Sequence, residues 1–433
     1  MARPLAGAGM NGARLARSGF PVALAGLALI GFAARVAYAL ATRDPDGFTG
    51  DALWYHLVAN NLADGHGYVV PFQFVGSFDV HLGIGASPVP TAFHLPLLPT
   101  VLAGFSVVGL DSEEAHLVVG CACGALTIVL VGLLGRRLAG PAAGVAAAAL
   151  AALYPAMVMN DSVGLSESLT GPTVAAALLA ALRLRERPGP GRALVLGLVI
   201  GLATLNRSET LLLAPLLGVP ALLPSRSLQL GGLLLLATAL TIAPWTIRNL
   251  TTFDRTTFLT TGDGSVFKGA NCPTTYRGGF TGGWDIRCLA GGRVPRDESV
   301  LSERWRREAV DYAGDNARRL PVVVAARVAR TFALYPSPSR QVNDLQFLEG
   351  RPRWLVWAAL AVYAAVAALA IAGIVGLRAQ PGVVAIMLAP VALVVVTSAL
   401  GYGTWRFRQA AEVALVTLAG VAVAQLAGRV RRA

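Results

Sequence analysis

The sequence predicts an all-α protein that crosses a membrane many times. Hydrophobic residues make up 55% of the 433-residue chain and charged residues only 14%, whereas a soluble domain carries about a quarter charged residues. The mean hydropathy is +0.60, and the apolar residues gather into long stretches. A helix needs ~20 such residues to cross the hydrocarbon core of a bilayer. These observations exclude a soluble globular protein.

About ten apolar stretches fit spanning helices. They cover residues 20–41, 114–134, 141–159, 168–182, 193–205, 208–223, 228–246, 354–376, 381–400 and 409–428. A further apolar stretch at 93–110 contains Pro96 and Pro99, and proline interrupts the hydrogen bonding of a helix. We therefore expect 93–110 to lie at the membrane surface and not to span.

The arginines orient these helices in the membrane. With 93–110 at the surface, the short loops on one side hold the basic clusters at 3–17, 136–137, 183–192, 226, 378 and 429–432. Cytoplasmic loops carry such an excess of basic residues, so both termini should be cytoplasmic. The net charge of +12 could suggest nucleic-acid binding, but these clusters lie between apolar segments, so we reject that function.

This orientation divides the chain into three parts. Residues 1–246 form an N-terminal transmembrane module that includes a first extracytoplasmic loop at 42–113. Residues 247–353 form an extracytoplasmic loop domain, and 354–433 form the C-terminal transmembrane helices. We expect a multi-pass protein of the inner or plasma membrane. Nearly all the carboxylates lie in the predicted extracytoplasmic parts or at the outer ends of helices. A charged group at the membrane edge costs free energy, so these carboxylates indicate a functional site.

The first loop holds the segment Gly50-Asp51-Ala52-Leu53-Trp54-Tyr55-His56. Asp51 and Tyr55 are four residues apart, so on a helix they share a face. A plain helix cap would explain Asp51 alone, but long ordered loops are usually functional. His94, just before Pro96, has two readings: a structural histidine, or a contact to a phosphate or a sugar.

Two further acids and four arginines fall at the same side of the membrane. Asp161 and Glu167 follow the third apolar stretch, and Glu167 has a simpler reading as a complement to a helix dipole. The arginines are Arg207, Arg248, Arg406 and Arg408. Each alone could be an ordinary snorkelling side chain. Four together, on the side that the topology rule disfavours, fit bidentate binding of phosphate.

These motifs resemble a known family. The first-loop Asp51-x-x-x-Tyr55, His94-x-Pro96, Leu153-Tyr154-Pro155 followed by Ser166-Glu167, Asn206-Arg207-x-Glu209, Pro244-Trp245-x-x-Arg248-Asn249 and Trp405-Arg406-Phe407-Arg408 are similar to bacterial glycosyltransferases of the GT-C superfamily. The nearest group is glycosyltransferase family 39, with the protein mannosyltransferases and the aminoarabinose transferases of lipid A. The order of the motifs carries the resemblance over nearly the whole chain.

The resemblance implies a GT-C-like bundle and inverting transfer of a hexose or pentose from a polyprenyl-phosphate donor at the outer membrane face. The acceptor would be a glycan, lipid or protein of the cell envelope. The resemblance also implies that Asp51 is the general base. Many relatives carry a second acid directly after it, where this chain has Ala52. That departure leaves Asp161 and Glu167 both eligible as the partner acid.

The chemistry assigns a role to each group. Transfer to a hydroxyl needs one carboxylate to take the acceptor proton, and the leaving phosphate needs cations. We expect Arg248 and Arg406, with Arg207 or Arg408 as helpers, to hold the phosphate. Tyr55, His56 and His94 would line the substrate cavity. We expect no cofactor and no obligatory metal, although two outer acids could recruit a cation.

Two other classes of function compete with the transferase. A lipid or polysaccharide transporter, or a flippase, would place its polar groups near the bilayer midplane in paired repeats. Here those groups collect at one face, and the sequence contains no visible repeat. A non-catalytic subunit of an envelope assembly would tolerate the loss of Asp51, Arg248 and Arg406.

The cysteines form two pairs of different character. Cys121 and Cys123 lie in an apolar stretch and are expected to be inert. Cys272 and Cys288 bracket a polar, glycine-rich stretch in the oxidising compartment, so we expect them to form a disulfide. Closing this loop would stabilise the fold by about 3 kcal/mol.

The orientation can be tested by labelling single introduced cysteines in intact cells. Sites near Asp79 and Gly291 should react with a membrane-impermeant reagent from outside. A site near Arg187 should react only after permeabilisation, because it lies in a predicted cytoplasmic loop. Labelling near Arg187 in intact cells would overturn the orientation.

Overall fold

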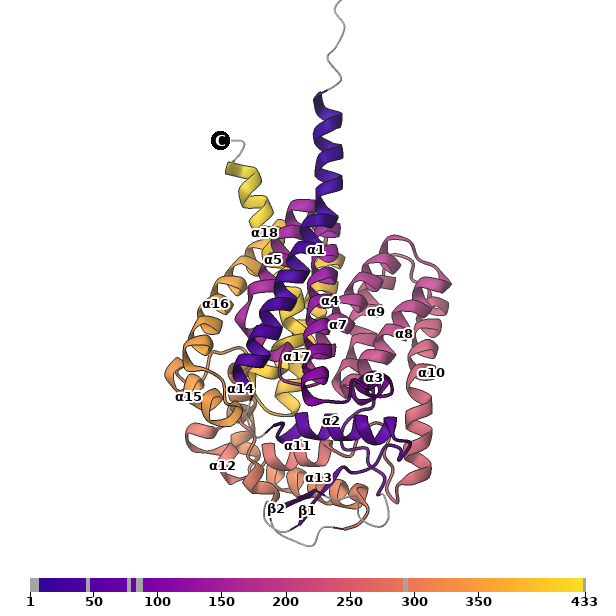
Figure 1. Ribbon diagram of the computed structural model, residues 1–433, viewed down its shortest axis with the longest axis vertical. Coiled ribbons are helices and arrows are strands. Elements are labelled where there is room, and N and C mark those ends of the chain that lie inside the picture. Colours follow the sequence, from indigo (N-terminus) through magenta and orange to yellow (C-terminus); the bar gives the residue numbers. More distant parts are fainter. Residues whose placement is uncertain (1–7, 44–46, 76–78, 83–88, 291–294, 431–433) are drawn as a thin grey trace, which may run out of the picture.

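The computed structural model describes residues 8–43, 47–75, 79–82, 89–290 and 295–430. Upright helices form a bundle, and shorter helices cover one end of it as a cap (Figure 1). The outer ends of α1 and α18 lie at the opposite end of the bundle (Figure 1). Both predicted extracytoplasmic loops contribute to the cap.

The bundle contains eleven of the described helices. They are α1 (Ala8–Thr42), α4 (Glu113–Ala139), α5 (Pro141–Leu153), α6 (Pro155–Asp161), α7 (Glu167–Glu186), α8 (Pro190–Asn206), α9 (Leu213–Leu222), α10 (Leu228–Thr252), α16 (Arg353–Gly376), α17 (Pro381–Leu400) and α18 (Gln409–Val430). Two short 3-10 segments join them, η1 (Ser208–Leu212) and η5 (Trp405–Arg408).

The cap is built from the two loops. The first loop supplies α2 (Gly50–Ala63), the antiparallel strands β1 (Phe72–Val75) and β2 (Asp79–Leu82), and α3 (Leu97–Ser106). The second supplies α11 (Asp263–Ala270), α12 (Pro273–Tyr276), α13 (Glu298–Asp315), α14 (Leu320–Thr331) and α15 (Pro338–Glu349), with 3-10 turns η2 (Gly278–Phe280), η3 (Ile286–Leu289) and η4 (Ala317–Arg319).

The all-α membrane fold is confirmed, but the expected count of about ten spans is not. All ten predicted stretches are helical. Six helices are long and apolar enough to span, and α5 and α6, bent by 61°, make a seventh if they are counted as one. The three missing spans are α7, α8 and α9. The 20-residue α7 carries charged residues at both ends, Glu167 at its start and Arg183, Arg185 and Glu186 at its end, and α8 and α9 have only 17 and 10 residues. The 10-residue α3 is likewise too short to cross.

Small residues let the central helices approach closely. A Cβ on Gly144 of α5 would lie 2.5 Å from the carbonyl oxygen of Gly132 on α4. A Cβ on Gly420 of α18 would lie 2.6 Å from the backbone nitrogen of Ala147. Packing through glycine and alanine is typical of helices associating in lipid. It explains the unusually glycine- and alanine-rich sequence.

The predicted disulfide is confirmed. Cys272 and Cys288 are joined, with their Cα atoms 6.3 Å apart. The bond ties the start of α12 to η3 within the cap. Cys121 is buried and unpaired, and Cys123 is also a free thiol.

A buried ion pair fastens the bent helix α6 inside the bundle. Arg35 Nε lies 2.8 Å from Asp161 Oδ2, and neither side chain is exposed. The guanidinium also donates to the carbonyls of Gly31 and Ala151. Asp161 Oδ1 accepts from Gln409 Nε2 at 2.9 Å. Both charged groups are thus satisfied by neighbours from α1, α5 and α18, as burial requires.

Removing one partner should destabilise the protein strongly. Asp161→Ala leaves the Arg35 charge buried without compensation, which costs about 3–5 kcal/mol. Thermal unfolding in detergent should show the loss. The double variant Arg35→Met with Asp161→Asn removes both charges and keeps an acceptor for Gln409, so it should recover much of the stability. An equal loss in both variants would contradict this role of the pair.

Candidate active site

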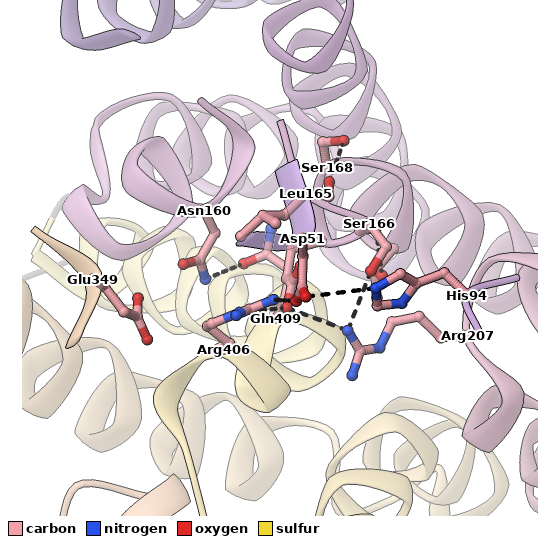
Figure 2. Close-up of polar contacts among 12 residues, drawn as sticks. Asp51, His94, Asn160, Leu165, Ser166, Ser168, Arg207, Glu349, Arg406 and Gln409 are labelled. Atoms are coloured by element: carbon pink, nitrogen blue, oxygen red, sulfur yellow. Dashed lines mark hydrogen bonds and ion pairs between the residues drawn. The ribbon is translucent and has the colours of Figure 1, made fainter. Parts of the chain in front are cut away.

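Asp51 lies in the first turn of α2 and faces a cluster of charged side chains (Figure 2). The N-cap is Thr49, so the carboxylate of Asp51 is not used as a helix cap. Its Oδ1 lies 3.5 Å from Nε2 of His94, and its Oδ2 lies 3.5 Å from Nη2 of Arg406. The side chain is 42% exposed, so it remains accessible to a substrate.

A chain of ion pairs continues from Asp51 into the protein. Arg406 Nε donates to Glu167 Oε1 at 2.9 Å, so one guanidinium bridges Asp51 and Glu167. Arg207 Nη1 approaches the same Glu167 oxygen at 3.2 Å, and Arg207 Nε pairs with Glu209 at 2.5 Å. Glu167 is only 1% exposed. Two arginines neutralise this buried carboxylate, as its desolvation requires.

Opposing effects set the pKa of the Asp51 carboxyl. Partial burial raises the pKa, but the hydrogen bond and charge of His94 and the charge of Arg406 outweigh it, so the pKa lies well below its ordinary value of 3.8. Burial, and then the charge of Asp51, raise the pKa of the Tyr55 phenol. At neutral pH Asp51 is ionised and Tyr55 is neutral. With these partners Asp51 is a weak base.

A narrow pocket beside the cluster has two chemically different walls. Among its lining residues, the charged Glu167, Arg207 and Arg406 are here called the charged wall, and the apolar Leu393 and Val394 of α17 the apolar wall. Arg207 also lies over the ring of Phe407, 5.2 Å from its centroid. A ligand with an anionic head and an apolar tail would satisfy both walls. No group of three or more His, Cys, Asp and Glu suited to a metal ion occurs in the described ranges.

Arg248 and Arg408, both predicted to bind substrate, make structural contacts away from Asp51. Arg248 donates to the backbone carbonyls of Thr91 at 2.8 Å and Tyr68 at 3.0 Å. Arg408 is 1% exposed and pairs with Glu412 at 2.5 Å. Arg406 and Arg408 diverge because residues two apart on a helical turn do not face each other.

Three other predicted residues lie around the cluster in different ways. The ring of Tyr55 packs 4.7 Å from that of His94 and supports it. His56, on another face of α2, turns away and contacts His116, with their Nδ1 atoms 3.0 Å apart. Asp161 is held by Arg35 inside the bundle. Of the two eligible partner acids, only Glu167 joins Asp51 through a shared arginine.

Three groups near the cluster were not assigned from the sequence. Glu209 pairs with Arg207, and its place in the Asn-Arg-x-Glu motif was the signal that could have identified it. Ser166 Oγ accepts from Arg207 at 3.3 Å. Glu349, at the end of α15, lies on the far side of Arg406 (Figure 2) and acts on it electrostatically. No local pattern marks Glu349.

The stabilities of variants at Arg406 and Arg408 test the different positions of these two arginines. Arg408→Gln would strand the buried charge of Glu412 and should cost about 3–5 kcal/mol. Arg406→Gln should cost less, because its side chain is 25% exposed and Glu167 keeps Arg207. Thermal unfolding of both variants in the same detergent gives the comparison. A larger loss for Arg406→Gln would contradict the geometry.

The model of the dolichyl-phosphate-mannose-protein mannosyltransferase family matches residues 92–247. No curated protein sequence gives a significant match. Among solved structures, the archaeal oligosaccharyltransferase AglB from Archaeoglobus fulgidus, in complex with an inhibitory peptide and a dolichol-phosphate, matches with a TM-score of 0.56 at 14% identity. The match covers 96% of this chain and 51% of that chain.

Two further structures are similar. The same oligosaccharyltransferase in complex with zinc and sulfate matches with a TM-score of 0.56 at 14% identity, over 94% of this chain and 49% of that one. ArnT from Cupriavidus metallidurans bound to undecaprenyl phosphate matches less closely, with a TM-score of 0.44 at 15% identity over 95% and 79% of the two chains. This chain spans about half the length of the oligosaccharyltransferase chains. The family match and the oligosaccharyltransferase fold confirm the predicted resemblance: the chain has the fold of the GT-C superfamily of membrane glycosyltransferases.

Proposed function

We propose that this protein is a glycosyltransferase that moves a sugar from a polyprenyl-phosphate donor to a hydroxyl acceptor at the outer face of the inner or plasma membrane. One observation carries the proposal: an accessible carboxylate, Asp51, shares Arg406 with a pocket that has a charged wall and an apolar wall. A base, a phosphate site and a lipid site therefore adjoin one another. The sugar can be a hexose or a pentose, and the acceptor a glycan, a lipid or a protein.

The two walls of the pocket fit the two ends of the donor. The guanidinium forks of Arg207 and Arg406 bind phosphate oxygens, since a planar fork matches their geometry. The apolar wall on α17 takes the first units of the polyprenyl chain. The likeness to an oligosaccharyltransferase solved with a dolichol-phosphate supports a lipid phosphate as the ligand. Glu167 stays beneath the arginines and orients them.

Transfer proceeds as one displacement at the anomeric carbon. The acceptor oxygen attacks that carbon while Asp51 takes the hydroxyl proton. The bond between the anomeric carbon and the phosphate oxygen breaks, and its electron pair leaves with the phosphate. Arg207 and Arg406 stabilise the charge that develops on the leaving group. The sugar emerges with inverted configuration, and the proton ends on Asp51.

Donor binding and base activation are coupled through Arg406. Without donor, this guanidinium pairs with Asp51 at 3.5 Å and helps to lower its pKa. A phosphate in the pocket competes for the same N–H groups, so Arg406 moves its charge away from Asp51. The carboxylate then becomes more basic. The enzyme thereby holds a weak base until the donor is in place.

A single substitution tests the chemistry. Asp51→Asn should lower the release of polyprenyl phosphate from a lipid-phosphate sugar about 10²–10⁴-fold, because it removes the general base. Binding of the donor should persist, since the arginines remain. The assay follows turnover with a panel of polyprenyl-phosphate sugars and donor binding in parallel.

The matched control is Asp64→Asn, which changes an exposed carboxylate at the other end of α2. It should keep wild-type turnover. Full activity of Asp51→Asn would remove Asp51 from the chemistry. Movement of the intact lipid-linked sugar across the bilayer, with no release of polyprenyl phosphate, would favour the flippase instead.

A further inference from the structure

We infer that Glu298, in the second loop, is a positioning residue that holds His94 of the first loop against Asp51. The inference rests on the proposed function of Asp51. Glu298 is the first residue of α13. The segment that it binds lies more than two hundred residues earlier in the chain. Residues 91–94 form that segment, which we call the His94 strap.

The carboxylate of Glu298 binds the strap at two points and the second loop at a third. Its Oε1 accepts from the backbone N–H of Ala92 at 2.5 Å and from the hydroxyl of Thr261 at 2.6 Å. Its Oε2 accepts from the hydroxyl of Thr91 at 2.9 Å. Thr91 and Ala92 are fully buried, and Thr261 nearly so. Three donors therefore converge on one side chain where water has little access.

The rest of the strap backbone is also bound. The carbonyl of Ala92 accepts from the N–H of Thr261 at 3.0 Å, and that of Phe93 accepts from the hydroxyl of Thr260 at 2.7 Å. The Phe93 N–H donates to the hydroxyl oxygen of Thr91 at 3.1 Å. Hydrogen bonds from the second loop and from Thr91 thus hold the backbone of the strap, which leaves it little freedom to shift.

Two further residues hold the strap through its carbonyl groups. Arg248 at the end of α10 donates to the carbonyl of Thr91, and the phenol of Tyr68 donates to the carbonyl of His94 at 3.0 Å. Arg248 and Glu298 therefore both bind Thr91, and their opposite charges act on each other. This contact gives Arg248 a role in holding the strap.

A carboxylate suits this position better than an amide. Both Glu298 oxygens receive donors, and Gln would place an N–H₂ group where one oxygen now accepts. Glu298 makes no ion pair within the part of the chain that the structure describes. Its charge is instead met by three hydrogen bonds, by the nearby charge of Arg248 and by the positive N-terminus of α13. Loss of this group would release the Ala92 N–H and allow His94 to move.

A double-mutant cycle tests the inference on the full-length protein. If Glu298 acts through His94, Glu298→Ala should lower kcat about 10- to 100-fold, the cost of a small misplacement near the reacting groups. The donor KM should stay unchanged, because Arg207 and Arg406 are intact. In a His94→Ala background, Glu298→Ala should then change kcat by less than about twofold, since coupled residues are not additive. Equal effects in both backgrounds would overturn the inference.

The matched control is Asp297→Ala. Asp297 caps the same helix by accepting from Ser299 N–H at 2.7 Å, but it makes no contact with the strap among the described hydrogen bonds. It should therefore lower activity by the same factor in both backgrounds. A purely structural role of Glu298 would give this result too.

Hydrogen exchange gives a readout that needs no activity. A peptide containing residues 91–95 should lose protection in Glu298→Ala and keep it in Asp297→Ala, while Glu298→Asp should retain part of it. Retained protection in Glu298→Ala would also overturn the inference. Failure of the proposed function would show separately, as full turnover in Asp51→Asn.

Discussion

The guanidinium of Arg406 ties together three regions that are distant in the sequence. It contacts Asp51 of α2 and Glu167 of α7 from η5, close to the start of the last bundle helix. Because Glu167 is almost completely buried, its charge must be compensated, and the cost of leaving it unpaired fixes where η5 and α7 can lie. The position of the accessible Asp51 follows from this pairing. An electrostatic requirement inside the protein thereby aligns the first loop, the bundle and the last loop.

The bend between α5 and α6, and the contacts that follow it in the chain, determine where Glu167 lies in the bundle. The break between α5 and α6, at Tyr154-Pro155, turns the chain by 61°, and Arg35 holds the end of α6 through Asp161. The chain then returns through Ser166, whose carbonyl accepts from Asn206 at 2.9 Å. Asp161 was expected near the chemistry from its sequence position. The structure gives it the different task of anchoring the turn that leads to Glu167.

Hydropathy was sufficient to find every bundle helix, because an apolar stretch in lipid has no stable alternative to a helix. The order of the motifs also indicated Asp51, His94, Glu167, Arg207 and Arg406, which the structure brings together. Sequence spacing could not say that Arg408 turns inward while Arg406 turns toward Asp51, since the direction depends on the local 3-10 backbone. Glu298 carried no signal at all. Its partners are one backbone N–H and two threonine hydroxyls, and no motif in the sequence links these groups to Glu298.

The apolar wall of the pocket has a consequence for how such an enzyme would meet its donor. α17 supplies that wall and also carries the partly exposed Val395 and Val396. A polyprenyl chain bound there would stay in the bilayer, so the protein would meet such a donor by a search in two dimensions. The quantity that sets the rate is then the mole fraction of donor among the surrounding lipids, and dilution of the aqueous phase leaves it unchanged. The rate of encounter with an acceptor that arrives from water would depend instead on its concentration in the aqueous volume. The amounts of the two substrates would therefore be expressed in different units.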